Sequence, residues 1–189
     1  MSAEKALEKR RISIKTQVLA SAAAVVGAVL IPQLFHVLGA ASGLGTSLGE
    51  IFLPMHLPII IVGLLAGPYA GAASGLIGPL ASFAVSGMPG IPMLPFMMIE
   101  LCIYGLVSGL MRGSKMPVIA KVLAAQLAGR AVRAAAVLIA VYGFGSDIAS
   151  ASIWTSVSKG LFGLVLQWTF IPLIIYRIEN AEKNERISE

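Results

Sequence analysis

Two long stretches without a charged residue dominate the pattern of polar and hydrophobic positions. Residues 16–49 contain no Asp, Glu, Lys or Arg over 34 positions, and residues 51–99 contain none over 49 positions. About 20 apolar residues carry a helix across the ~30 Å hydrocarbon core of a bilayer, so the second stretch must cross the membrane, turn and cross back. Gly67 with Pro68, and the Gly- and Pro-rich segment 86–92, are the natural places for these turns.

The alternation of apolar runs and polar breaks continues to the end of the chain and predicts an all-α integral membrane protein. We expect six transmembrane helices at residues 17–37, 51–66, 69–86, 93–111, 118–142 and 153–176. Residues 1–16 would form a basic N-terminal segment, residues 17–176 the membrane domain, and residues 177–189 a charged tail. The composition agrees, because only 12% of the residues are charged, whereas a soluble domain has roughly 25%.

The basic residues outside the spans all fall on one side of the membrane. The segment before the first span, the loop between the fourth and fifth spans, and the C-terminal tail hold eleven Lys and Arg, whereas the three opposite segments hold only Glu50 and Asp147. Since Lys and Arg gather on the cytoplasmic side, we expect both termini in the cytoplasm. A cleaved signal peptide is the alternative for the basic start, but an uncut first span gives the even number of helices that the basic tail requires.

Apart from Lys121, which is counted with the basic loop because it lies at the very start of the fifth span, four ionisable residues remain inside the spans: Glu100, Arg130, Arg133 and Lys159. Each is costly in hydrocarbon unless it is paired or functional, and at 1.5 Å per residue all four lie roughly 9–18 Å below the outer ends of their helices. One acid against three bases leaves two positive charges without a partner. We expect an outward-opening pocket for an anionic or strongly polar molecule, in which Arg133 and Lys159 hold the anion and Glu100 either orients Arg130 or accepts a hydrogen bond from a ligand hydroxyl. The alternative is a structural bridge between Glu100 and Arg130, with Lys159 reaching to the surface.

Two further features allow two interpretations each. His56 lies between Pro54 and Pro58, which lack an N–H and so make this helix start irregular. His56 either contacts a ligand or satisfies a freed carbonyl, whereas His36 lies in apolar surroundings and is expected to be structural. In the first span, small residues at Ala20, Ala24 and Ala28 allow close helix approach, either to a partner helix or within the chain.

Several kinds of site are not indicated. The chain has no HExxH or GxxxxGK[ST] pattern, and the Gly-rich run 67–79 predicts close helix packing and not a nucleotide cradle. The single cysteine, Cys102, excludes an intrachain disulfide and a multi-cysteine metal site. The net charge of +5 is explained by the flanking segments, so no nucleic-acid partner is expected. We expect a protein that is not an enzyme and that has no cofactor.

Several runs of the sequence resemble the substrate-binding S components of energy-coupling factor (ECF) transporters. They are FLPMHLPI (52–59), GLLAGP (63–68), GP (78–79), SGMP (86–89), MMIELCIYGLVSG (97–109) and GR (129–130). The resemblance implies a six-helix subunit of the bacterial plasma membrane that captures a vitamin or cofactor precursor at its outward face. It also implies a transmembrane coupling subunit and two cytoplasmic ATPases as partners, which agrees with the lack of a nucleotide motif here.

The resemblance also implies roles for particular residues. In this family the first helix docks the coupling subunit through an Ala-xxx-Ala pattern, which both Ala20/Ala24 and Ala24/Ala28 match. The family's ligand site uses the first outer loop and the outer halves of the last three spans, where Glu100, Arg133 and Lys159 fall.

The ligand is less well defined than the family. Surplus Arg and Lys favour a carboxylate or phosphate, with pantothenate as the leading candidate, a B6 vitamer next, and folate or cobalamin behind. A membrane-embedded enzyme and a helical scaffold without a ligand are the alternatives from other classes.

The predicted topology is testable with single cysteines in a Cys102→Ser background. A cysteine at Ser146 should react with an impermeant thiol reagent in intact cells, whereas a cysteine at Ser114 should react only after the cells are opened. The reverse pattern would contradict the orientation.

Overall fold

The computed structural model describes residues 12–146 and 151–188, and within these ranges every regular element is a helix. The helices are α2 (Ile14–Ala41), α3 (Ser47–Phe52), α4 (His56–Ala66), α5 (Pro68–Ser86), α6 (Leu94–Leu110), α7 (Val118–Leu138) with the π-helical turn η1 (Ile139–Gly143), and α8 (Ser152–Ser188). Lys5, Lys9, Arg10, Arg11 and Asp147, which the orientation argument used, lie outside the described residues.

The predicted all-α membrane fold is confirmed. Five helical segments are long and apolar enough to cross a bilayer: α2, the pair α3 and α4, α5, α7 with η1, and α8. The sixth, α6, has 17 residues, a length of about 25 Å that lies at the short limit for a span. The described part of α8 runs without interruption past the expected end of the last span at residue 176, so no break in the helix separates the membrane domain from the tail.

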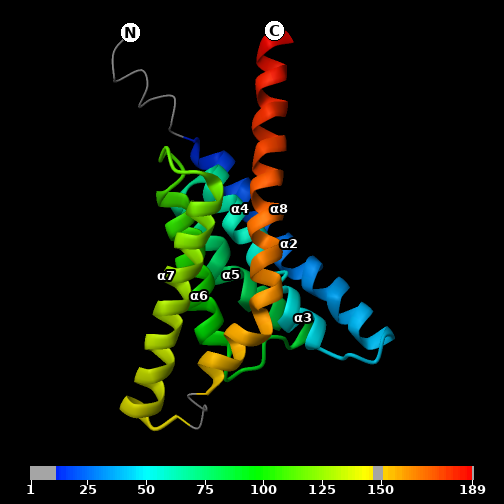
Figure 1. Ribbon diagram of the computed structural model, residues 1–189, viewed down its shortest axis with the longest axis vertical. Coiled ribbons are helices and arrows are strands. Elements are labelled where there is room, and N and C mark those ends of the chain that lie inside the picture. Colours follow the sequence, from blue (N-terminus) through cyan, green and yellow to red (C-terminus); the bar gives the residue numbers. More distant parts are fainter. Residues whose placement is uncertain (1–11, 147–150, 189) are drawn as a thin grey trace.

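The helices run alternately up and down, so that the connections gather at two ends of the bundle. The start of α2, the turn from α4 to α5, the loop from α6 to α7 and the end of α8 lie at one end, and the remaining connections lie at the other (Figure 1). The first of these ends holds Arg112, Lys115 and Arg177, which is the grouping that the positive-inside argument requires. The side of the membrane on which this end lies stays a prediction.

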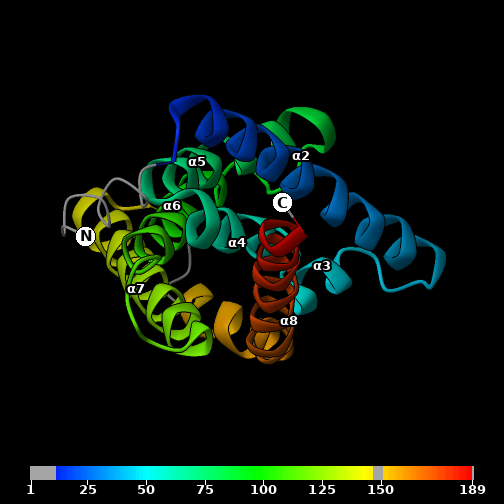
Figure 2. The ribbon, with the colours of Figure 1, turned by 90° about the horizontal axis from the view of Figure 1, so that it is seen from above.

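Helix α4 lies at the centre of the bundle, with the other helices around it (Figure 2). Eight of its eleven residues are buried, because its sequence HLPIIIVGLLA is apolar on almost every face. Ile59 and Ile60 are fully buried and pack in one cluster with Leu101 and Tyr104 of α6 and with side chains from α2, α7 and α8. Helix α4 therefore packs against helices from both the N-terminal and the C-terminal parts of the chain.

Glycines allow α5 and α6 to touch backbone to backbone. A Cβ atom on Gly71 would collide with the carbonyl of Gly105, and one on Gly105 would collide with the carbonyl of Gly71. One turn away, a Cβ on Gly75 would meet the carbonyl of Leu101. The close packing predicted for the Gly-rich run is confirmed, and it provides the van der Waals contact that holds helices together in lipid.

The alanines of the first span face the interior of the chain. Ala28 is fully buried, Ala24 is 6% exposed and packs with Val62 and Ala70, and Ala20 is half-buried against the same cluster. This is the internal packing that the spacing left open as an alternative. Docking of a partner helix on these alanines stays a prediction, and in this conformation their own chain covers them.

The irregular helix start predicted around Pro54 is present as a break between α3 and α4. Leu53 takes the left-handed conformation (φ 49°, ψ 48°), which is uncommon for a residue with a branched side chain, and α4 begins at His56. The break interrupts the backbone hydrogen-bond ladder inside the membrane domain, so the carbonyl of Leu53 needs partners from other groups.

Replacing glycine at the contact between α5 and α6 should lower stability. In Gly105→Ala the new methyl group has no space, so we expect the free energy of unfolding to fall by about 1–3 kcal/mol. Gly143→Ala is the matched control, because its Cβ would meet only Ile139 at an ordinary 3.8 Å. Thermal unfolding of both variants in one detergent measures the difference, and equal stabilities would contradict the packing argument.

Candidate functional site

A cavity of about 310 Å³ lies at the end of the bundle where α3, the loop between α5 and α6, and the start of α8 meet. This is the end opposite the start of α2 and the end of α8. Its volume lies at the lower end of the ~300–1,000 Å³ range of small-molecule sites. Its polar and charged lining residues are His36, Thr46, Glu50, His56, Ser82, Arg130, Arg133, Ser152, Thr155, Ser156 and Lys159.

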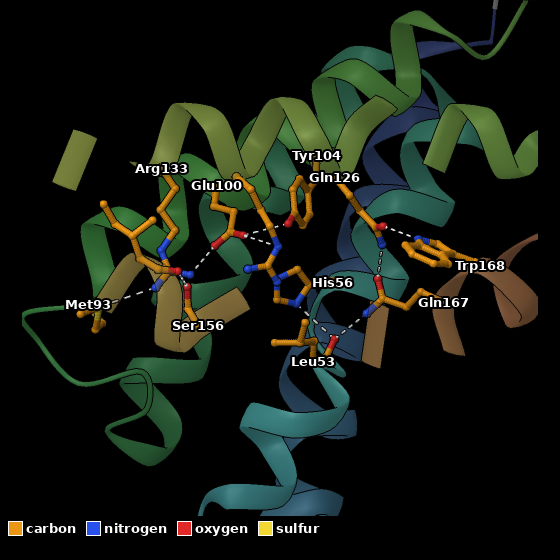
Figure 3. Close-up of polar contacts among 12 residues, drawn as sticks. Leu53, His56, Met93, Glu100, Tyr104, Gln126, Arg133, Ser156, Gln167 and Trp168 are labelled. Atoms are coloured by element: carbon orange, nitrogen blue, oxygen red, sulfur yellow. Dashed lines mark hydrogen bonds and ion pairs between the residues drawn. The ribbon is translucent and has the colours of Figure 1, made fainter. Parts of the chain in front are cut away.

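The buried carboxylate of Glu100 organises one wall of this cavity. Its side chain is 1% exposed, Oε2 accepts a 2.8 Å hydrogen bond from Nη1 of Arg133, and Oε1 accepts a 2.8 Å hydrogen bond from the hydroxyl of Tyr104 (Figure 3). Nε of Arg130 lies 4.0 Å from Oε1. The carboxylate therefore has two hydrogen-bond donors and two cations beside it, which compensates the cost of burying its charge.

Arg130 and Arg133 both lie on the cavity wall, but their guanidinium groups are used differently. Arg133 donates to Glu100 and also contacts the sulfur of Met93 at 3.8 Å. Nε of Arg130 is buried and has no hydrogen-bond partner. The sequence analysis paired Glu100 with Arg130, whereas the structure makes Arg133 the closer partner. Arg130 is thus the cation with an unused donor in the buried wall.

Lys159 lies at the rim of the cavity and not beside Glu100. Its Nζ donates a 2.8 Å hydrogen bond to Oε2 of Glu50, and the two side chains are 61% and 47% exposed. Such an exposed pair contributes little to stability. Counted inside the predicted spans alone, two positive charges had no acidic partner. Glu50 on α3 lies just outside the predicted second span, and it pairs with Lys159. The described charges in the buried cluster are then the carboxylate of Glu100 and the guanidinium groups of Arg130 and Arg133. This cluster has a surplus of one positive charge.

His56 fulfils one of its two predicted roles and is placed for the other. Its Nδ1 lies 3.1 Å from the carbonyl oxygen of Leu53, and its ring packs against the ring of Tyr104 with centroids 5.2 Å apart. The side chain thus satisfies a carbonyl freed at the helix break. It also lines the cavity although the residue is only 2% exposed.

A chain of polar side chains behind His56 was not found from the sequence. The indole N–H of Trp168 donates to Oε1 of Gln126 (2.7 Å), Nε2 of Gln126 donates to Oε1 of Gln167 (3.0 Å), and Nε2 of Gln167 donates to the carbonyl of Leu53 (3.2 Å) (Figure 3). The signal was present, because each glutamine stands in an otherwise apolar stretch. What the sequence could not show is that residues 41 positions apart face each other.

The structure also changes the interpretation of His36. Expected to be a structural residue in apolar surroundings, it lines the cavity and packs closely on Gly49, where an added Cβ would lie 3.3 Å from the imidazole ring. The expected apolar surroundings were wrong because α3 folds back against α2, and no local pattern indicates that contact; the structural role of His36 stays a prediction.

Four methionines supply much of the apolar surface of the cavity: Met55, Met88, Met93 and Met97. Their unbranched, polarizable side chains adapt to the shape of a bound molecule. In the described part of the chain, no group of three or more His, Cys, Asp or Glu is placed to hold a metal ion. Guanidinium, imidazole and hydroxyl groups beside a soft apolar wall suit a small organic anion.

One family of known proteins matches most of the chain. The family of ECF transporter substrate-specific components matches residues 13–175, which include all six membrane-crossing segments up to the last turns of α8. No curated protein and no solved structure gives a significant match. The match confirms the resemblance of the sequence runs described above. The chain therefore belongs to the ECF transporter substrate-specific components, the multi-pass membrane subunits that bind the substrate in vitamin-type uptake.

Proposed function

We propose that the chain is a high-affinity binding subunit for a small anionic vitamin or cofactor precursor, which it captures in the cavity at the outer face of the bacterial plasma membrane. Both termini lie in the cytoplasm, and a transmembrane coupling subunit with two ATPases supplies the energy for uptake. The observation that carries the proposal is the buried Nε of Arg130, which lies 4.0 Å from Oε1 of Glu100 and donates no hydrogen bond, in a cavity wall with surplus positive charge.

Arg130 is the primary anion contact. A guanidinium has five N–H donors in a planar fork that matches a carboxylate or phosphate, and the buried Nε of Arg130 donates no hydrogen bond. An anion beside it would also neutralise the positive charge that Glu100 leaves uncompensated. A scaffold without a ligand would have no use for such a group, since a buried unpaired donor costs about 1–3 kcal/mol.

The remaining candidate contacts have distinct roles. Arg133 is a second cation whose position Glu100 fixes, so the carboxylate orients the guanidinium groups and does not itself bind the anion. Lys159 stands at the rim, where its charge attracts an anion before it enters. His56 contributes a neutral polar contact from the break between α3 and α4.

The size and lining of the cavity favour a compact ligand. A volume of about 310 Å³ suits pantothenate or a B6 vitamer better than the larger folate and cobalamin. Pantothenate combines a carboxylate with a branched apolar centre, which match the guanidinium groups and the methionine surface respectively. We therefore retain pantothenate as the leading candidate and a B6 vitamer as the next.

The two arginines should separate affinity from stability. Arg130→Met removes the free guanidinium and should weaken pantothenate binding roughly ten- to a hundredfold, the equivalent of losing a charge-assisted hydrogen bond of about 1.5–3 kcal/mol. Its thermal stability in detergent should change little, because Glu100 keeps Arg133 and Tyr104. Isothermal titration and thermal unfolding of the same preparations measure both quantities. Unchanged affinity in Arg130→Met would remove the basis of the proposal.

Arg133→Met should instead act first on stability. It removes the closest cation from a buried carboxylate, so we expect the free energy of unfolding to fall by about 3 kcal/mol. The double variant Arg133→Met with Glu100→Gln removes the charge left behind and should recover most of this loss in thermal unfolding. If the double variant is as unstable as the single one, Glu100 is not held in place by charge pairing.

A further inference from the structure

The carbonyl of Leu53 is an unusually well-satisfied acceptor. It receives hydrogen bonds from the backbone N–H of His56 (3.1 Å), from Nδ1 of His56 (3.1 Å) and from Nε2 of Gln167 (3.2 Å). Leu53 itself is held in the left-handed conformation, which is disfavoured for residues other than glycine. Donors from two helices therefore converge on the one peptide group that sets the direction in which α4 begins.

Chemistry fixes the direction of every hydrogen bond in the chain that ends at this carbonyl. An indole N–H only donates, so the atom of Gln126 that meets Trp168 must be its amide oxygen. The amide nitrogen of Gln126 then donates to the oxygen of Gln167, whose nitrogen donates to a carbonyl that only accepts. The indole N–H at one end only donates and the Leu53 carbonyl at the other end only accepts. Neither glutamine amide can therefore be reversed without placing two donors or two acceptors against each other.

The same reasoning fixes the proton on His56. Nδ1 lies 3.1 Å from an oxygen that only accepts, so Nδ1 carries the hydrogen. In the neutral ring Nε2 is then unprotonated and is a hydrogen-bond acceptor. The opposite tautomer would set the lone pair of Nδ1 against the lone pairs of the Leu53 carbonyl in a buried site.

We infer that Gln126 and Gln167 are positioning residues, which hold the Leu53 carbonyl so that His56 presents Nε2 to the cavity as an acceptor beside Arg130. Both glutamines are nearly fully buried, and His56 and Arg130 both line the cavity. The site therefore takes a molecule that bears a hydroxyl or N–H donor as well as an anionic group. This statement about the ligand depends on the proposed function, whereas the tautomer of His56 does not.

Nitrogen NMR of the full chain tests the inference without any ligand. The chain has two histidines, so ¹⁵N-histidine labelling in a His36→Gln background leaves the imidazole of His56 as the one labelled ring. We expect one species, with a protonated Nδ1 and an unprotonated Nε2. In Gln167→Leu we expect this single species to be lost and replaced by a mixture of the two tautomers.

A second variant keeps the experiment decisive if Gln167→Leu folds poorly. Gln126→Leu with Gln167→Leu removes both buried amides together, which avoids an unpaired group between them. Gln17→Leu is the matched control, because this glutamine bonds the carbonyl of Ile12 far from the cavity. It should leave the spectrum of His56 unchanged.

Two results would overturn the inference. If His56 is protonated on Nε2 in the chain without further changes, its imidazole presents a hydrogen-bond donor to the cavity and not the acceptor that we infer. An unchanged single tautomer in both glutamine variants, with thermal stability retained, would show that the glutamines do not position His56.

The ligand requirement is tested with pantothenate and an analogue that has no neutral donor, in which hydrogen replaces both hydroxyl groups and a methyl group replaces the amide hydrogen. We expect the chain to prefer pantothenate at least tenfold and Gln167→Leu to lose most of this preference, while both proteins keep their dependence on Arg130. Equal affinity for the two compounds would contradict the donor requirement. If pantothenate itself does not bind, it is not the ligand, and the tautomer result alone decides the roles of Gln126 and Gln167.

Discussion

Inside a bilayer a polar group must find its partners within the protein. This constraint explains two features of the structure, the hydrogen bonds at the Leu53 helix break and the surroundings of the buried Glu100 carboxylate. The break at Leu53 frees a carbonyl at the centre of the bundle, and side chains of α4 and α8 satisfy it. The carboxylate of Glu100 is satisfied by α6 and α7 in the same way. Each of these polar groups thus joins neighbouring helices by hydrogen bonds, in addition to their apolar packing.

The two polar networks meet in one place. The ring of His56 lies on the ring of Tyr104, and the hydroxyl of Tyr104 donates to Glu100, so groups from the helix break and from the charge cluster share one wall. Behind this wall, the glycine contact of Gly71 with Gly105 fixes α5 against α6. The side chains that line the cavity are therefore supported by helices and not by loops alone, which is the condition for a preorganised site.

The sequence predicted the fold more fully than the site. Gaps between charged residues mark the spans, and prolines on both sides of His56 mark the irregular helix start, because both signals are local. The partner of Glu100 is not local. Arg130 and Arg133 stand on one face of α7, and the rotation of α7 against α6 decides which of them reaches the carboxylate. The partnership of Glu50 with Lys159 depends likewise on the short helix α3 turning back toward α8, and the spacing of Ala24 and Ala28 fits internal packing as well as docking.

Helix α8 has a mechanical consequence. It begins with Ser152 and Ser156 at the cavity and continues as one helix to Ser188, a distance of about 55 Å. A rod of this length acts as a lever, in which a tilt of about 5° at one end displaces the other by about 5 Å. Pro172 lies within it and removes one rung of its hydrogen-bond ladder. A tilt of α8 at the cavity would thus displace the helical end at the opposite face of the bundle.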